Sequence, residues 1–259
     1  MFHSCTKKHL ITAVLSVGLL FCQQQLSAGE KSSDGFLTAS ELQRRGFEPL
    51  FTGTDLSKWK LGEGHRGHWV AKNGIIDYDG KATAKKHVDR GLWTKKSYRE
   101  TEFYVEWRFP DKPVMKPHPI VLWNGNFLRD EKGKRITRPH LDAGDSGILF
   151  RGILDCQANI WCQEMGSGEI NGYRTNKSLG QILRRSCIPF EFGDNPLGEW
   201  NAFLITLKDD RMKVELNGKL VLYSEKLPGL PERGPIGLQH HGDHVQFRNI
   251  WVKEIKCNE

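Results

Sequence analysis

The stretch "RMKVELNGKLVLY" (211–223) decides the fold class of this chain. Two short runs of alternating apolar and polar residues flank Asn217-Gly218. This dipeptide suits a type I′ turn, because both of its residues adopt a positive φ at little cost. "HWVAKNGIIDY" (68–78) repeats the arrangement around Asn73-Gly74. Both stretches predict antiparallel strands joined by tight turns.

The same alternation continues along most of the chain. "EFYVEWRF" (102–109) places its apolar residues on one face of a strand and its polar residues on the other. The one clear helix signal is "TASELQRR" (38–45), where Thr38 and Glu41 form a capping-box pattern. We therefore predict an all-β fold, a two-sheet antiparallel β-sandwich or jelly roll. Segments 125–144 and 174–198 are predicted to be long surface loops.

The beginning of the chain has the pattern of an export signal. Lys7 and Lys8 precede an apolar stretch (10–21) that is too short to span a bilayer, and Ser27-Ala28 provides small residues for cleavage. We predict a signal peptide over 1–28, a polar segment with a short helix over 29–46, and one jelly-roll domain over 47–256. The mature protein is then secreted or periplasmic, with no transmembrane segment.

Charge and cysteine content narrow the function further. Loss of the two leader lysines lowers the formal net charge from +7 to about +5, and the remaining bases are interspersed with acids. This pattern argues against nucleic-acid binding. Four cysteines follow the leader, and an oxidising compartment favours the disulfides Cys156–Cys162 and Cys187–Cys257 over metal ligation. No cofactor or metal is expected, although "DYDG" (77–80) leaves a structural calcium ion open.

One long stretch carries the candidate ligand site, "GDSGILFRGILDCQANIWCQEMGSGEINGYR" (144–174). Its two strand-like runs, 146–151 and 158–163, place five side chains side by side on one sheet: Arg151, Gln157, Asn159, Trp161 and Gln163. The glycines after them turn the chain and present Glu169. Polar groups beside aromatic rings are typical of sites for small polar ligands with apolar faces. The pattern indicates a carbohydrate.

Five stretches resemble the 3-keto-disaccharide hydrolase domain family in content and order. They are "FEPLFTGTDLSKW" (47–59), "GLWTKKSY" (91–98), "DSGILFRG" (145–152), "GEWNAFLITLKDDRMKVELNGKLV" (198–221) and "GPIGLQHHGDHVQFRNIWVKEI" (234–255). The resemblance implies a concanavalin A-like jelly roll, secretion from a bacterium, and cleavage of glycosides whose C3 hydroxyl is oxidised to a ketone. A partner sugar 3-dehydrogenase would supply such a substrate.

A 3-keto sugar opens a route that needs a base, an acid and donors to an enolate oxygen, because the ketone acidifies the hydrogen on C2. We assign Glu169 and His241 to base or acid roles, and Arg151 to oxygen donation. His240 and His241 are neighbours on a strand, so only His241 is expected to act there while His240 packs or caps the turn. The predicted substrate-binding residues are Asp145, Trp161, Gln163, Tyr173, Gln239 and His240.

Two other functions use the same fold. A glucanase of the laminarinase type would need Glu-x-Asp-x-x-Glu on one strand, whereas here Glu102 and Glu106 lack the intervening Asp and suit a solvent-facing strand surface. A non-catalytic carbohydrate-binding module remains the main alternative. The groups able to transfer protons distinguish the enzyme from that module, since a lectin needs none.

Overall fold

The computed structural model describes residues 1, 35–51, 53–83 and 90–256. Residues 2–28 of the predicted signal peptide and Cys257 lie outside the described residues. The helices are α1 (Ala39–Arg44), the 3-10 helix η1 (Glu63–His65), α2 (Asn171–Thr175) and α3 (Gln181–Ser186). The strands are β1 (Glu48–Pro49), β2 (Trp59–Lys60), β3 (Trp69–Lys72), β4 (Ile75–Tyr78), β5 (Gly91–Thr94), β6 (Thr101–Arg108), β7 (Val114–Pro119), β8 (Thr137–Asp142), β9 (Asp145–Leu149), β10 (Gln157–Trp161), β11 (Asn201–Lys208), β12 (Arg211–Leu216), β13 (Lys219–Tyr223), β14 (Gly237–Gln239) and β15 (Val245–Glu254).

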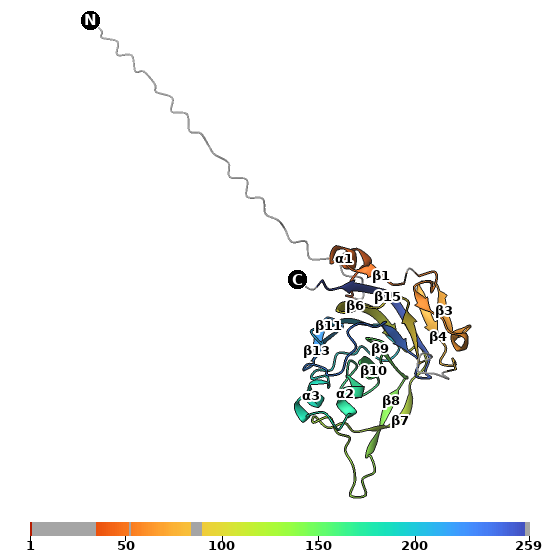
Figure 1. The fold of residues 1–259 in the computed structure, drawn as a ribbon, viewed down its shortest axis with the longest axis vertical. Coiled ribbons are helices and arrows are strands. Elements are labelled where there is room, and N and C mark those ends of the chain that lie inside the picture. The colour runs from red at the N-terminus through yellow and green to blue at the C-terminus, as the bar shows by residue number, and fades with distance from the viewer. Residues whose placement is uncertain (2–34, 52, 84–89, 257–259) are drawn as a thin grey trace.

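Two antiparallel sheets form the body of the molecule (Figure 1). The larger sheet has the order β13-β12-β11-β6-β15-β4-β3, with β1 added beside β15, and the smaller has the order β10-β9-β14-β5-β2. Apolar residues of both sheets meet in one core, where the rings of Phe103 and Phe150 pack edge to face at 6.0 Å. The predicted all-β sandwich is confirmed.

Both predicted Asn-Gly turns are present. Asn217 (φ 53°) and Gly218 (φ 80°) join β12 to β13, and Asn73 (φ 52°) and Gly74 (φ 79°) join β3 to β4. Positive φ at both central residues is the signature of a type I′ turn, whose twist matches that of the paired strands. These two local signals fix the registers of two hairpins in the larger sheet.

The predicted N-terminal helix covers the outer face of the larger sheet. Thr38 caps α1 by accepting a hydrogen bond from the Glu41 amide, and Leu42 packs with Tyr104 of β6. Beside this cluster Glu106 is buried, and its Oε2 accepts from Arg248 Nε at 2.6 Å. The expectation that Glu106 faces solvent is wrong, because the helix and the arginine cover it.

The segment predicted as a surface loop over 125–144 is largely a hairpin. β7 pairs with β8 from Val114↔Asp142 to Pro119↔Thr137, and isolated bridges continue the ladder toward the tip. This hairpin forms a separate two-stranded sheet that extends from the sandwich (Figure 1). Its charged, Pro-containing sequence resembles a loop because neither face enters the core. The second predicted loop, 174–198, contains α3 and the end of α2.

The predicted Cys156–Cys162 disulfide is wrong. Cys156, Cys162 and Cys187 are all buried free thiols. Cys156 directly precedes β10 and Cys162 directly follows it, and both pack in the core with Ala158 and Ile160 as small apolar groups. Cys162 Sγ also accepts from the Ala143 amide at 3.4 Å and donates to the Gly144 carbonyl at 3.6 Å.

This arrangement predicts the thiol chemistry of the chain. We expect a thiol reagent in denaturant, without reductant, to label at least the three cysteines above in a protein lacking residues 1–28. In the folded state the same three should react slowly, since burial raises the pKa of Cys156 and Cys162 and withholds the thiolate, in Cys162 to about 11. Fewer than three labelled thiols in denaturant would contradict the structure.

Candidate active site

The candidate site lies on the outer face of the smaller sheet, the face directed away from the sandwich core. Ile148, Ala158, Ile160 and Leu238 point into the core, so the residues that alternate with them face outward. Across neighbouring strands, Trp161 pairs with Asp145, and Asn159 pairs with Gly147. Side chains in such pairs stand about 5 Å apart, so Trp161, Asp145 and Asn159 adjoin one another around Gly147.

Gly147 forms a low point in this face. A Cβ added there would lie 2.7 Å from Gln157 Oε1 and 3.2 Å from Gln239 Oε1. These two amide oxygens and Asn159 Oδ1 are buried and have no hydrogen-bond partner among the described residues. Buried acceptors without donors are costly in a protein interior. Three of them around one glycine are suited to receive the hydroxyl groups of a sugar.

Asp145 and His241 form the titratable part of the site. Their closest atoms, Asp145 Oδ2 and His241 Nδ1, are 3.8 Å apart. Burial, together with charge repulsion from Asp243, raises the pKa of Asp145 to about 8. Burial also lowers the pKa of His241, partly offset by Asp243. At neutral pH the site therefore holds a protonated carboxyl group beside a neutral imidazole.

Glu169, predicted to transfer protons, lies in a buried ion pair with Arg174. Its carboxylate is buried, and Arg174 donates to it twice, from Nε to Oε2 at 2.7 Å and from a terminal nitrogen to Oε1 at 3.2 Å. Burial raises the pKa of Glu169, while Arg174 and the side chain of Asn159 oppose that rise. Glu169 is therefore linked to the site through its hydrogen bond with the side chain of Asn159.

Three other predicted site residues lie away from this cluster. Arg151 follows the opposite end of β9 from Asp145, and its guanidinium donates to the carbonyls of Pro231 and Glu232. Tyr173 donates its hydroxyl to the Pro228 carbonyl at 2.9 Å. His240 packs on the core side, where its ring contacts Tyr78 and its Nδ1 bonds the Tyr78 hydroxyl. Each of the three is occupied by contacts within the fold.

The chain resembles known proteins in sequence and in fold. A sequence model described as a 3-keto-alpha-glucoside-1,2-lyase-like domain matches residues 46–253. The chain belongs to this family. No curated protein matches.

Solved structures similar to this lyase-like chain include a protein described as a "putative glycosyl hydrolase" from Parabacteroides distasonis ATCC 8503. It is 18% identical, covers 85% of this chain and 99% of its own, and superposes with a TM-score of 0.53. The carbohydrate binding module CBM66 from Bacillus subtilis is 13% identical, covers 70% of this chain and 96% of its own, and has a TM-score of 0.38. The first likeness supports the sandwich fold.

The β7–β8 hairpin of the lyase-like domain adds side chains that the sequence did not indicate. His118 Nε2 donates to Asp142 Oδ2 at 2.6 Å, and Lys116 Nζ donates to Asp142 Oδ1 at 3.1 Å. Gln163, a predicted site residue, lies 3.4 Å from His118 Nδ1 through its side-chain nitrogen. The charges of Asp142 and Lys116 both act on Asp145. Lys116 and His118 are two residues apart, the spacing that places two side chains on one face of a strand, and this spacing was the available sequence signal.

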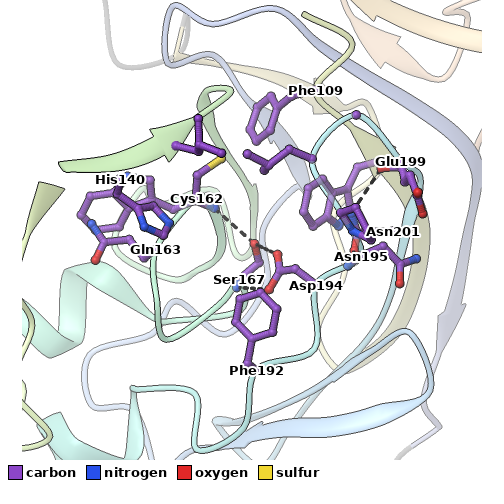
Figure 2. Close-up of a pocket in the computed structure, with 16 residues that line it drawn as sticks. Phe109, His140, Cys162, Gln163, Ser167, Phe192, Asp194, Asn195, Glu199 and Asn201 are labelled. Atoms are coloured by element: carbon purple, nitrogen blue, oxygen red, sulfur yellow. Dashed lines mark hydrogen bonds between the residues drawn. The ribbon is translucent and has the colours of Figure 1, made fainter. Parts of the chain in front are cut away.

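A pocket of about 380 Å³ adjoins this cluster at the end of the sandwich (Figure 2). Trp161 and Gln163 line it, and so belong to both the pocket and the polar site. In Figure 2, His140, Cys162 and Gln163 lie on one side, Asn195, Glu199 and Asn201 on the other, and Ser167 bonds Asp194 between them. The pocket is mostly apolar, with Trp107, Phe109, Leu141, Phe192 and Leu197 among its lining residues.

Within residues 35–51, 53–83 and 90–256, no group of three or more His, Cys, Asp and Glu side chains is arranged to hold a metal ion. Nor does any helix in that part of the lyase-like chain have the length and apolar character to cross a membrane.

Proposed function

We propose that this chain cleaves 3-keto-glycosides by removing the C2 proton and eliminating the group on C1, followed by addition of water. One observation carries the proposal: Asp145 and His241 lie 3.8 Å apart beside unpaired amide oxygens, and their surroundings favour a protonated carboxyl group and a neutral imidazole. A carboxyl group whose pKa is raised and an imidazole whose pKa is lowered are suited to act as acid and base.

In this mechanism His241 and Asp145 each transfer one proton. His241 accepts the proton from C2, whose electron pair forms the enolate of the C3 ketone. The enolate then expels the substituent on C1, the C1–O bond breaks, and Asp145 donates its proton to the departing oxygen. Water next adds across the C1–C2 double bond and gives the free 3-keto sugar. The amides of Gln157, Asn159 and Gln239 hold hydroxyl groups during these steps.

Turnover in D₂O tests this proposal directly. The purified chain is incubated with 3-keto-trehalose, with a 3-keto-glucoside and with the unoxidised sugars, and the products are followed by NMR. We expect cleavage of the oxidised sugars only, with deuterium at C2 of the released 3-keto-glucose. Cleavage without deuterium at C2 would replace elimination with direct hydrolysis. Binding of every sugar without turnover would instead support a carbohydrate-binding module.

The pH profile provides a second prediction. We expect a bell-shaped profile of kcat/KM, because turnover needs Asp145 protonated and His241 neutral. Activity should fall as the pH rises through about 8, where Asp145 loses its proton. It should also fall as the pH drops through the pKa of His241, which lies below 6.5. His241→Asn should lower turnover about 10²–10⁴-fold and flatten the acidic limb. If the acidic limb is unchanged in His241→Asn, another residue is the base.

We also propose that the protein is exported, on the leader pattern of residues 1–28. Its substrate must come from an enzyme that oxidises the C3 hydroxyl of a glycoside, since the mechanism needs the ketone. A sugar 3-dehydrogenase is therefore the expected functional partner.

A further inference from the structure

We propose that the pocket at the end of the sandwich binds the departing group of the substrate, and that it selects a neutral aromatic aglycone. This inference rests on the proposed function, because it identifies which substituent on C1 leaves. The pocket is defined by the residues that line it in Figure 2.

The pocket lies where the departing group must go. Trp161 is the cross-strand neighbour of Asp145, the proposed acid, and Trp161 also lines the pocket. Gln163 connects the two regions as well, since it lines the pocket and contacts His118. An oxygen that takes its proton from Asp145 therefore lies at the mouth of the pocket, and its substituent extends inward.

The walls of the pocket are suited to a flat ring. Trp107 near the end of β6 and Phe109 just beyond it line the pocket, as do Phe192 and Leu197, and Figure 2 places Phe109 and Phe192 on opposite sides. A volume of about 380 Å³ is within the range of small-molecule pockets, roughly 300–1,000 Å³. A second sugar would place many hydroxyl groups against these apolar surfaces, whereas an aromatic ring would bury its faces there.

Charge in the pocket defines the aglycone further. Asp194 and Glu199 line it, and the described lining residues include no lysine or arginine. Asp194 is fixed by Ser167, whose amide donates at 2.9 Å and whose hydroxyl donates at 2.6 Å. Burial raises the pKa of Asp194 while the hydrogen bonds from Ser167 oppose that rise, and Glu199 adds a second acidic group. Acidic groups without a cation among the lining residues disfavour an anionic ring. The pocket therefore favours a neutral aglycone over a carboxylated one.

The test measures binding of unreactive glucosides, so it does not depend on turnover. Methyl, 4-nitrophenyl and 4-carboxyphenyl α-glucosides differ only in the group that would enter the pocket, and their Kd values are measured by calorimetry. We expect the 4-nitrophenyl glucoside to bind about tenfold or more tightly than the methyl glucoside. The 4-carboxyphenyl glucoside, nearly the same shape, should lose most of that gain.

Leu197→Lys then reverses the charge preference. Leu197 is 39% exposed at the rim, so a lysine can be accommodated there and can pair with Glu199 or with a carboxylated ligand. We expect it to weaken 4-nitrophenyl binding and to strengthen 4-carboxyphenyl binding, each by about threefold to tenfold. Leu220→Lys is the matched control, because Leu220 is 43% exposed on β13 and does not line the pocket. If Leu197→Lys unfolds, Leu141→Lys takes its place, because Leu141 also lines the pocket.

The outcomes separate this proposal from the one on which it rests. Equal Kd values for all three glucosides overturn the aglycone pocket, even if 3-keto-trehalose is cleaved. An unchanged charge preference in both lysine variants also overturns it. Ring-dependent binding that Leu197→Lys inverts supports the pocket. If no 3-keto sugar is cleaved in the same preparation, that support remains and the catalytic proposal fails.

Discussion

Asp145→Asn is expected to lower turnover of 3-keto-trehalose about 10²–10⁴-fold while changing substrate affinity little. Asparagine keeps the size of the side chain and its contacts within the sheet but has no acidic proton to give. The basic limb of the pH profile, expected near pH 8, should disappear with the carboxyl group. Steady-state kinetics over a range of pH values measure both effects.

The nature of the departing group makes this prediction specific. A 4-nitrophenolate leaves without a proton, so Asp145→Asn should affect a 4-nitrophenyl 3-keto-glucoside far less than 3-keto-trehalose. Asp210→Asn is the control, since Asp210 lies in the β11–β12 turn, and asparagine tolerates its φ of 55°. Equal losses for both substrates would remove Asp145 from the role of acid and leave it a binding residue.

Arg174→Met is expected to lower the free energy of unfolding by about 3–5 kcal/mol, the usual cost of leaving a buried charge unpaired. Arg174 is fully buried and pairs with the buried carboxylate of Glu169. It also donates to the Gly125 carbonyl and stacks over Phe127, so its loss affects the segment between β7 and β8 as well. Urea unfolding at pH 7 measures the change.

A double variant isolates the charge contribution. Glu169→Gln removes the unpaired carboxylate, so Arg174→Met combined with Glu169→Gln should be more stable than Arg174→Met alone. The matched control is Arg211→Met, which breaks the exposed ion pair with Glu225 at 2.8 Å and should cost less than about 1 kcal/mol. Equal stability of the two arginine variants would show that the Glu169–Arg174 pair does not support the fold.

Local sequence signals predicted the parts of this protein that depend on local geometry. The Asn-Gly turns and the Thr38 cap work over a few residues, and each is present as expected. Alternation along the strands also placed Trp161 and Asn159 on one face, and it separated His240 from His241. Strand order brings Asp145 and His241 together, because β9 pairs with β14, and periodicity alone does not predict that order.

Contacts between distant segments explain what the sequence did not predict. Arg151 lies in the family motif just after β9, and its guanidinium donates to carbonyls about eighty positions away. The spacing of residues in the sequence does not reveal such a contact. Glu169 was expected to transfer protons, yet Arg174 occupies both of its oxygens. The arginine five residues along was the available clue. His118 and Asp142 meet through the hairpin ladder, so their pairing depends on a register that loop-like composition conceals.

Because β7 and β8 form a sheet of their own, the hairpin can be exchanged as a unit. The hairpin pairs with itself and leaves the sandwich between Phe109 and Gly144. At Gly144 a side chain would lie 2.8 Å from Asp243 and 2.9 Å from the Phe109 ring, so this exit point requires glycine. Between these two anchors, hairpins of other lengths and sequences can be grafted without altering a strand pair in either sheet. Substrate preference can thereby diversify while the Asp145–His241 pair stays in place.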